Sequence, residues 1–223
     1  MKERLIIKNS KVIDFLDMRN KEVIERAVKK TEKFFGKKVD FEVVLLETRE
    51  EIDLIYSKYF GKDFKTEDWV VGGIFDDKTV YIFREDVYGK VSCHPQESFF
   101  PTLVHEITHI FTSKLFKFHL PMWLYEGLSY FVAGQDKEVD LKEKEDLMKA
   151  HTEIEWRLTN PYLTSGKFVR YLFDKYGKKK LFKLFKELDE DETKSSFEEK
   201  FQKILNEKYK LIWEEWYTDP DIL

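Results

Sequence analysis

The stretch that most constrains the fold of this 223-residue chain is His105-Glu106-Ile107-Thr108-His109, which lies inside a strongly apolar run. Residues four apart lie on one face of an α-helix, so this spacing places the two imidazoles one turn apart. Two imidazoles at that spacing can bind one tetrahedral Zn²⁺, and Glu106 can reach a water on the metal. Because the rest of the helix is apolar, we expect it to be buried.

A second helix, predicted from Pro121 onwards, supplies a candidate third ligand. Proline is typical of a first helical turn, and the apolar residues Leu124, Leu128 and Phe131 recur at helical spacing. Among them stands one carboxylate, Glu126. A carboxylate is costly to bury among apolar neighbours unless it is paired or binds a metal, so we expect Glu126 to be the third ligand.

Taken together, H-E-x-x-H and, after a short loop, W-L-x-E-G-L resemble the gluzincin branch of zinc metallopeptidases. More narrowly, they are similar to its small peptidase MA-like domains. Phe168–Gly177 reads F-V-x-Y-L-x-x-x-Y-G and is similar to a later helix of that pattern, while Trp213–Trp216 is similar to its end. The resemblance covers about residues 70–217. It departs at Tyr130, where some gluzincins place an Asp that accepts a hydrogen bond from the first His ligand.

The resemblance implies zinc-dependent hydrolysis of peptide bonds by a metal-activated water. One Zn²⁺ per chain would be held by His105, His109 and Glu126, with Glu106 as the general base. A zinc metallopeptidase of this type acts on a peptide or protein substrate, which is the partner we expect.

Three other residues were considered in addition to His105, Glu106, His109 and Glu126. Tyr162 stands where the family pattern has a Tyr, and it is the candidate donor that stabilises the developing oxyanion. His151 is the second candidate for that role, and His119 is expected to be structural. A tyrosine between helices is otherwise usually a packing residue, so the role of Tyr162 stays open.

Two other interpretations compete with the peptidase. The first is a catalytically weak or inactive zinc-stabilised module that binds peptides or a partner protein on the same fold. The Tyr at position 130 and the lack of any visible specificity signal favour it. The second is a zinc-free helical scaffold with an accidental motif, which Glu126 and the downstream match disfavour.

We predict an α+β fold forming a single zincin-like catalytic domain over residues 1–223. A small N-terminal mixed sheet, with an edge hairpin packed on the metal helix, forms a lobe over about 1–116. A mostly helical lobe follows over about 117–223, with the active-site cleft between the two.

The hairpin is predicted from the apolar runs Trp69–Phe75 and Thr79–Phe83, which Asp76-Asp77-Lys78 joins. Gly72-Gly73 suggests close backbone approach or a bulge. By resemblance, one arm would receive the substrate backbone by strand addition, whereas an ordinary hairpin is the alternative.

Three further segments carry expectations that a structure can check. Residues 84–97, which contain Cys93-His94-Pro95, are expected to form a solvated loop and to supply no extra metal ligand. The charge-dense Asp136–Lys149 is expected to be an exposed helix or lid. Pro161–Gly166 is expected to be a turn before the helix Lys167–Tyr176, which Gly177 ends.

Charge, the length of apolar runs and the cysteine count indicate which partners and which cellular compartment to expect. The 39 basic and 43 acidic residues are interspersed and leave a formal charge of −4, which argues against nucleic-acid binding. No apolar run is long enough for a signal peptide or a membrane span, so we expect no membrane association. A single cysteine, Cys93, excludes an intrachain disulfide, and a cytoplasmic protein fits best. The oligomeric state stays open.

Overall fold

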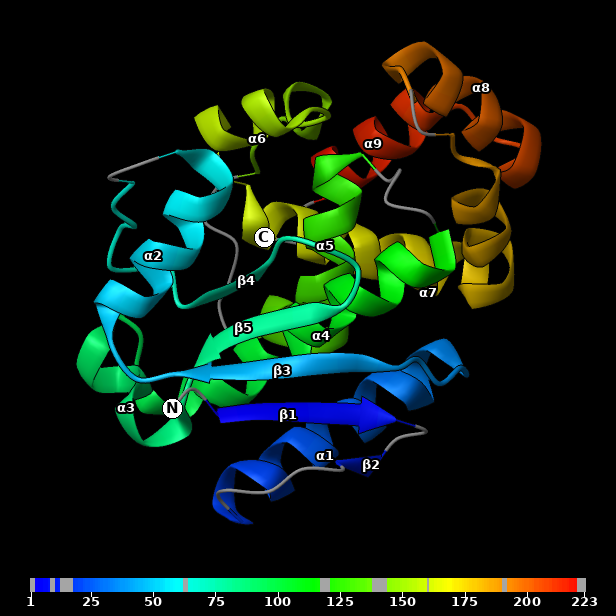
Figure 1. The fold of residues 1–223 in the computed structure, drawn as a ribbon. Coiled ribbons are helices and arrows are strands. Elements are labelled where there is room, and N and C mark those ends of the chain that lie inside the picture. The colour runs from blue at the N-terminus through cyan, green and yellow to red at the C-terminus, as the bar shows by residue number, and fades with distance from the viewer. Residues whose placement is uncertain are drawn as a thin grey trace. The chain divides into compact units, whose positions relative to one another are not determined.

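The computed structural model describes residues 3–8, 11–12, 18–61, 64–116, 121–137, 144–159, 161–189 and 192–219. The chain forms two compact units, Met1–Phe111 and Thr112–Leu223. The first unit combines a sheet with helices, and the described part of the second is helical (Figure 1). The predicted α+β class is therefore confirmed.

The sheet of the first unit is mixed, and its described strands run in the order β2-β1-β3-β5-β4 (Figure 1). The strands are β1 (Glu3–Lys8), β2 (Lys11–Val12), β3 (Phe41–Leu46), β4 (Gly72–Ile74) and β5 (Thr79–Phe83). β3 pairs in parallel with β5, and the other pairs are antiparallel. β3 is rich in β-branched and apolar residues and is almost wholly buried, as expected of a central strand. β4 lies at one edge.

The helices of this unit are α1 (Met18–Phe35), α2 (Arg49–Phe60), α3 (Glu85–Val91) and the greater part of α4 (Phe99–Phe116). At the start of α2, the Glu51 carboxylate accepts hydrogen bonds from the backbone N–H groups of Glu47 at 2.7 Å and Thr48 at 3.4 Å. This is the reciprocal cap that the spacing of Thr48 and Glu51 favours. Gly61, with φ +113°, ends the helix.

The solvated loop predicted over residues 84–97 is wrong for most of its length, because α3 and a 3₁₀ helix, η1 (Gln96–Ser98), occupy it. Tyr88 explains the difference: its ring is fully buried, and its hydroxyl lies 2.8 Å from the Thr102 Oγ1 on α4. Burying one large ring stabilises a short helix that has little apolar content of its own. Cys93 is exposed, and His94 Nε2 lies 2.8 Å from the Trp69 carbonyl oxygen.

The described helices of the second unit are α5 (Met122–Ala133), α6 (Glu153–Thr159), α7 (Tyr162–Glu187), α8 (Lys194–Leu205) and α9 (Tyr209–Thr218). Two 3₁₀ helices, η2 (Gln135–Lys137) and η3 (Leu147–Lys149), lie between α5 and α6. Aromatic rings fill the interior: Phe168 packs within 5.1 Å of both Trp213 and Trp216, and Trp123 stacks on Tyr209 at 5.6 Å.

The turn predicted over Pro161–Gly166 is wrong, because α7 begins at Tyr162. Thr164, Ser165 and Gly166 are buried helical residues, and Ser165 Oγ donates to the Pro161 carbonyl at 2.8 Å. A hydroxyl that bonds back to its own helix needs no solvent, so a polar sequence can form a buried first turn. The break predicted at Gly177 is confirmed: its φ of +74° interrupts the helical backbone.

The exposed segment predicted over Asp136–Lys149 is wrong for Asp136 and Lys144, which are both buried. Lys144 Nζ donates to the carbonyl oxygens of Trp216, Tyr217 and Asp219 at 2.9–3.0 Å, and so caps the end of α9. Residues 138–143 lie outside the described part.

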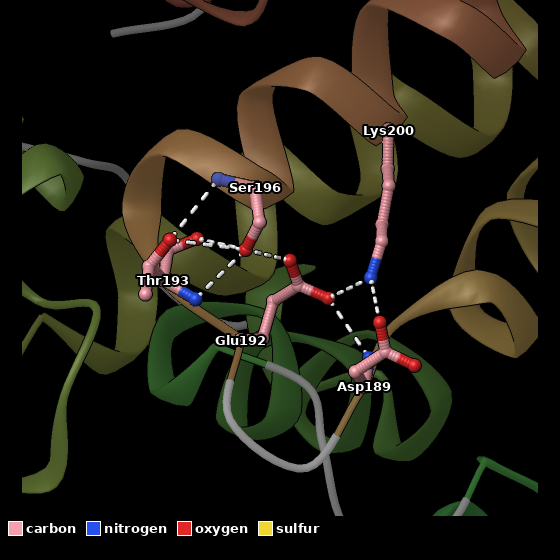
Figure 2. Close-up of polar contacts among 5 residues, drawn as sticks. All are labelled: Asp189, Glu192, Thr193, Ser196 and Lys200. Carbon is pink, nitrogen blue, oxygen red and sulfur yellow. Dashed lines mark hydrogen bonds and ion pairs between the residues drawn. The ribbon is translucent and has the colours of Figure 1, made fainter.

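The turn into α8 is held by a polar network (Figure 2). Thr193 and Ser196 cap the helix reciprocally, and Lys200 Nζ lies 2.7 Å from the Asp189 carboxylate and 2.6 Å from that of Glu192. Burial alone would raise the pKa of Glu192, but the hydrogen bonds from Lys200 and Ser196 lower it. The network keeps the carboxylate charged although it is buried.

Among the helices that the structure describes, none has both the length and the apolar character needed to cross a bilayer.

Candidate metal centre

Helix α4 presents His105 and His109 from consecutive turns, as the four-residue spacing predicts. The two residues are buried, with 7% and 5% of their surface exposed. Their Nε2 atoms are 3.0 Å apart, and the rings stand nearly perpendicular at 83°. The two ring nitrogens therefore converge on one point.

Glu126 on α5 completes a group of three possible ligands. One ligand atom from each of His105, His109 and Glu126 lies within 4.8 Å of the other two, and Glu126 is also buried. The group could therefore hold a metal ion. Within the described residues, no second cluster of His, Cys, Asp or Glu meets the same criterion.

Close packing of α5 on α7 fixes the backbone next to Glu126. A Cβ added at Gly127 would lie 2.6 Å from the Ser165 carbonyl oxygen, and one at Gly166 would lie 2.9 Å from the Tyr130 Cβ. Real Cβ atoms essentially never approach so closely, so both glycines are needed for this helix contact. The glycine in W-L-x-E-G-L was the available sequence signal for this role, which sequence reasoning missed.

An ion pair anchors the chain just beyond α5. Gly134 ends α5 with φ +89°, and Asp136 follows in η2 with a fully buried side chain. Arg170 on α7 donates from Nη2 to Asp136 Oδ1 at 2.8 Å and from Nε to Oδ2, which makes a bidentate pair. The pair fixes the end of the helix that carries Glu126, and no local sequence pattern indicates it because the partners are 34 residues apart.

Glu106 is half-buried on α4 and lies close to strand β4. A Cβ added at Gly72 would lie 3.5 Å from Glu106 Cγ and 2.7 Å from the Tyr81 carbonyl oxygen. Glycine at this position therefore permits the edge strand to approach both β5 and Glu106. The close backbone approach predicted from Gly72-Gly73 is confirmed at Gly72.

Tyr88 on α3 contacts the start of α4. Its hydroxyl interacts with Thr102 Oγ1 and accepts a hydrogen bond from Ser98 Oγ at 3.4 Å. Burial raises the pKa of Tyr88, and the negative charge of Glu106 adds to this. The phenol therefore stays neutral and links α3 to α4. Sequence reasoning missed this residue.

Two of the remaining candidate residues, Tyr162 and His151, lie in the helical unit. Tyr162 is the first residue of α7, and its ring lies 5.3 Å from that of Tyr130 and 4.8 Å from that of Trp156. His151 is buried against Phe197, with ring centres 5.8 Å apart, in the interior of the helical unit. Its Nε2 has no hydrogen-bond partner among the described residues. Burial lowers the pKa of His151. His119 lies outside the described residues.

Comparison of the chain with protein-family models, with curated proteins and with solved structures gave no match.

Proposed function

We propose that this chain is a zinc-dependent peptidase of the gluzincin type. The observation that carries the proposal is the convergence of the buried His105, His109 and Glu126 next to a half-buried Glu106. Three buried polar side chains in an apolar helix pair are expected only where they serve a site.

The donor set suits zinc. Two imidazole nitrogens and one carboxylate oxygen form the ligand set of a well-known class of catalytic zinc sites, which keep a fourth position for water or substrate. Zn–N distances of about 2.0–2.1 Å in a tetrahedral site separate two ligand nitrogens by about 3.3 Å. The 3.0 Å between the two Nε2 atoms is close to that separation.

Glu106 is the residue that moves protons in this proposal. When bound, zinc would lower the pKa of a water to about 7 and stabilise negative charge on the carbonyl oxygen. The Glu106 carboxylate accepts the proton of the attacking water and delivers it to the leaving amine. Its partial exposure leaves it accessible to a substrate, whereas the three ligands are buried.

Strand β4 is the proposed platform for the substrate. It is one of the two edge strands of the described sheet, and its Gly72 lies beside Glu106. An extended peptide can pair with such an edge through its backbone, which places a peptide carbonyl near the base. In this proposal β4 borders the substrate cleft, and the hydroxyl of Tyr162 stabilises the oxyanion.

One observation favours a second candidate, a zinc-stabilised module that binds peptides without cleaving them. Tyr130 stands where some gluzincins have an acidic residue, and its ring packs 5.3 Å from that of Tyr162. A metal-bound His usually has an acceptor on its other nitrogen, and a phenol oxygen is a weaker acceptor than a carboxylate.

Hydrolysis of a broad peptide library by zinc-loaded protein separates the two candidates. We expect wild type to cleave peptides and Glu106→Gln to be slower by roughly 10²–10⁴-fold while it retains zinc. Glu97→Gln is the matched control, because Glu97 is exposed in η1 just ahead of α4. Equal rates for wild type and Glu106→Gln would exclude the peptidase mechanism, and zinc binding with no cleavage of any peptide would favour the binding module.

A further inference from the structure

A cluster of aromatic side chains lies beside the edge strand β4. We call it the aromatic cluster, and it consists of Tyr56, Tyr59, Phe60, Phe64, Phe75 and Tyr81. The first three lie on one face of α2, at the spacing i, i+3 and i+4. Phe75 follows β4, and Tyr81 lies in β5.

Phe75 is the centre of the aromatic cluster. Its ring stacks on Tyr59 at 4.5 Å and meets Tyr56 edge-on at 4.8 Å. It also lies 6.0 Å from Phe60. The outer rings are open to solvent: 41% of Tyr59 and 50% of Phe60 is exposed. Exposed aromatic surface of this kind, gathered at one place, is typical of a binding site.

The aromatic cluster and Glu106 lie on opposite faces of β4. Successive residues of a strand face opposite sides of the sheet. A Cβ at Gly72 would point towards Glu106, whereas a Cβ at Gly73 would lie 3.1 Å from the Tyr56 hydroxyl and 3.7 Å from the Phe75 ring. The strand thus separates the catalytic side from an aromatic side.

The register of β4 shows where a bound peptide would meet both faces. Phe83 N–H donates to the Val71 carbonyl, and Gly73 pairs with Tyr81, so the backbone groups of Gly72 turn away from β5. The Tyr56 hydroxyl donates to the Gly72 carbonyl at 3.1 Å, which agrees with this direction. A peptide strand added here would place one side chain opposite Gly72, on the Glu106 face. Both neighbouring side chains would then lie on the face of the aromatic cluster.

We propose that the aromatic cluster is a specificity subsite that accepts an aromatic or large apolar side chain of a bound peptide. The side chain belongs to a residue next to the one opposite Gly72. This inference rests on the proposed use of β4 as the substrate edge. Phe75 and Tyr59 determine the preference, because their stacked rings offer a flat apolar surface that is partly exposed beside the edge.

The test uses pairs of peptides that are identical except for Phe or Ala at one position, scanned along the peptide. We expect wild type to have a higher kcat/KM for the Phe peptide at one position. Tyr59→Ala and Phe75→Leu should each reduce that Phe-to-Ala ratio by roughly 3- to 10-fold. Leu54→Ala is the control, since Leu54 lies on α2, is 66% exposed and is outside the aromatic cluster.

Binding to Glu106→Gln separates failure of this inference from failure of the peptidase proposal. If wild type cleaves nothing but Glu106→Gln binds the Phe peptide more tightly, and Tyr59→Ala in that background abolishes the preference, the subsite stands and the peptidase does not. Cleavage or binding that is equal for Phe and Ala at every position would overturn the subsite. So would a preference that survives both substitutions. Loss of self-association in Tyr59→Ala with unchanged peptide preference would assign the aromatic cluster to contact between copies of the chain and would also overturn it.

Discussion

Gly127 lies against Ser165 with no room for a side chain between them, since a Cβ at Gly127 would be 2.6 Å from the Ser165 carbonyl oxygen. This contact joins α5 to α7 directly beside Glu126. The position of the third candidate ligand therefore depends on how closely two helix backbones pack, and residues outside the centre can be used to test that dependence.

Gly127→Ala should destabilise the protein and weaken zinc binding. Alanine gains about 1 kcal/mol of helix propensity over glycine, but forcing a methyl group against a backbone carbonyl costs about 1–3 kcal/mol and shifts α5. Thermal denaturation and zinc titration measure the two effects. Gly89→Ala is the control, because its Cβ would meet only the end of the Gln96 side chain at 3.2 Å and nearby Gln96 backbone at 3.4 Å or more. A Gly127→Ala protein that is as stable as wild type and binds zinc equally would contradict the argument.

Arg170→Ala should lower the free energy of unfolding by about 3–5 kcal/mol, since it leaves the Asp136 carboxylate buried without its partner. Urea denaturation gives the value. Lys149→Ala is the control: its partner Asp146 is 41% exposed, and an exposed pair contributes less than about 1 kcal/mol. Similar losses in the two variants would show that burial of the Arg170–Asp136 pair has no special effect.

Lowering the pH below about 6.5 should lower the free energy of unfolding, and part of this loss should depend on His151. Burial lowers the pKa of His151. The charge of Lys194 lowers it further, whereas a backbone hydrogen bond at Glu192 and the carboxylates of Glu155 and Glu192 act in the opposite direction. The folded protein therefore keeps His151 neutral at a pH where the unfolded chain binds a proton, and that proton favours unfolding.

Urea denaturation of wild type and His151→Leu at pH 7.5 and 5.5 tests this sign. The variant should lose less stability between the two pH values, and the difference should be at most about 1.4 kcal/mol per pH unit. Both proteins share every other ionisable group, so the contributions of those groups cancel in the comparison. Parallel losses in the two proteins would refute the role of His151.

Tyr162→Phe should lower kcat by roughly 10²–10³-fold and leave KM nearly unchanged if the hydroxyl stabilises the oxyanion. Phenylalanine keeps the ring contacts with Tyr130 and Trp156, so a pure packing role predicts normal turnover. Tyr130→Phe is the matched control. Normal kcat in Tyr162→Phe would assign this residue to packing.

The elements that sequence reasoning predicted are those whose signals are local. The spacing of His105 and His109 and the break at Gly177 each depend on a few neighbouring residues, and the structure has them as predicted. Glu126 was predicted from the cost of burying a carboxylate, and it is buried within reach of both histidines.

The expectations that proved wrong depended on partners distant in the chain. Asp136 was predicted to be exposed because its neighbours are charged, but Arg170 neutralises it in the interior. Lys144 can be buried because carbonyl groups 72–75 residues away accept hydrogen bonds from its Nζ. The segment predicted to be a loop forms helix α3 because Tyr88 is buried and contacts α4. Such long-range contacts produce no periodic pattern in the sequence.

The most direct test of the account is the zinc content of unchelated protein, measured by mass spectrometry for wild type, His105→Ala and Glu126→Ala. His94→Ala is the control, because the His94 ring bonds to the Trp69 carbonyl rather than belonging to the ligand group. We expect about one zinc per chain in wild type and His94→Ala, and a large loss in both ligand variants. Wild type without zinc after reconstitution, or full zinc content in His105→Ala and Glu126→Ala, would contradict the proposed metal centre.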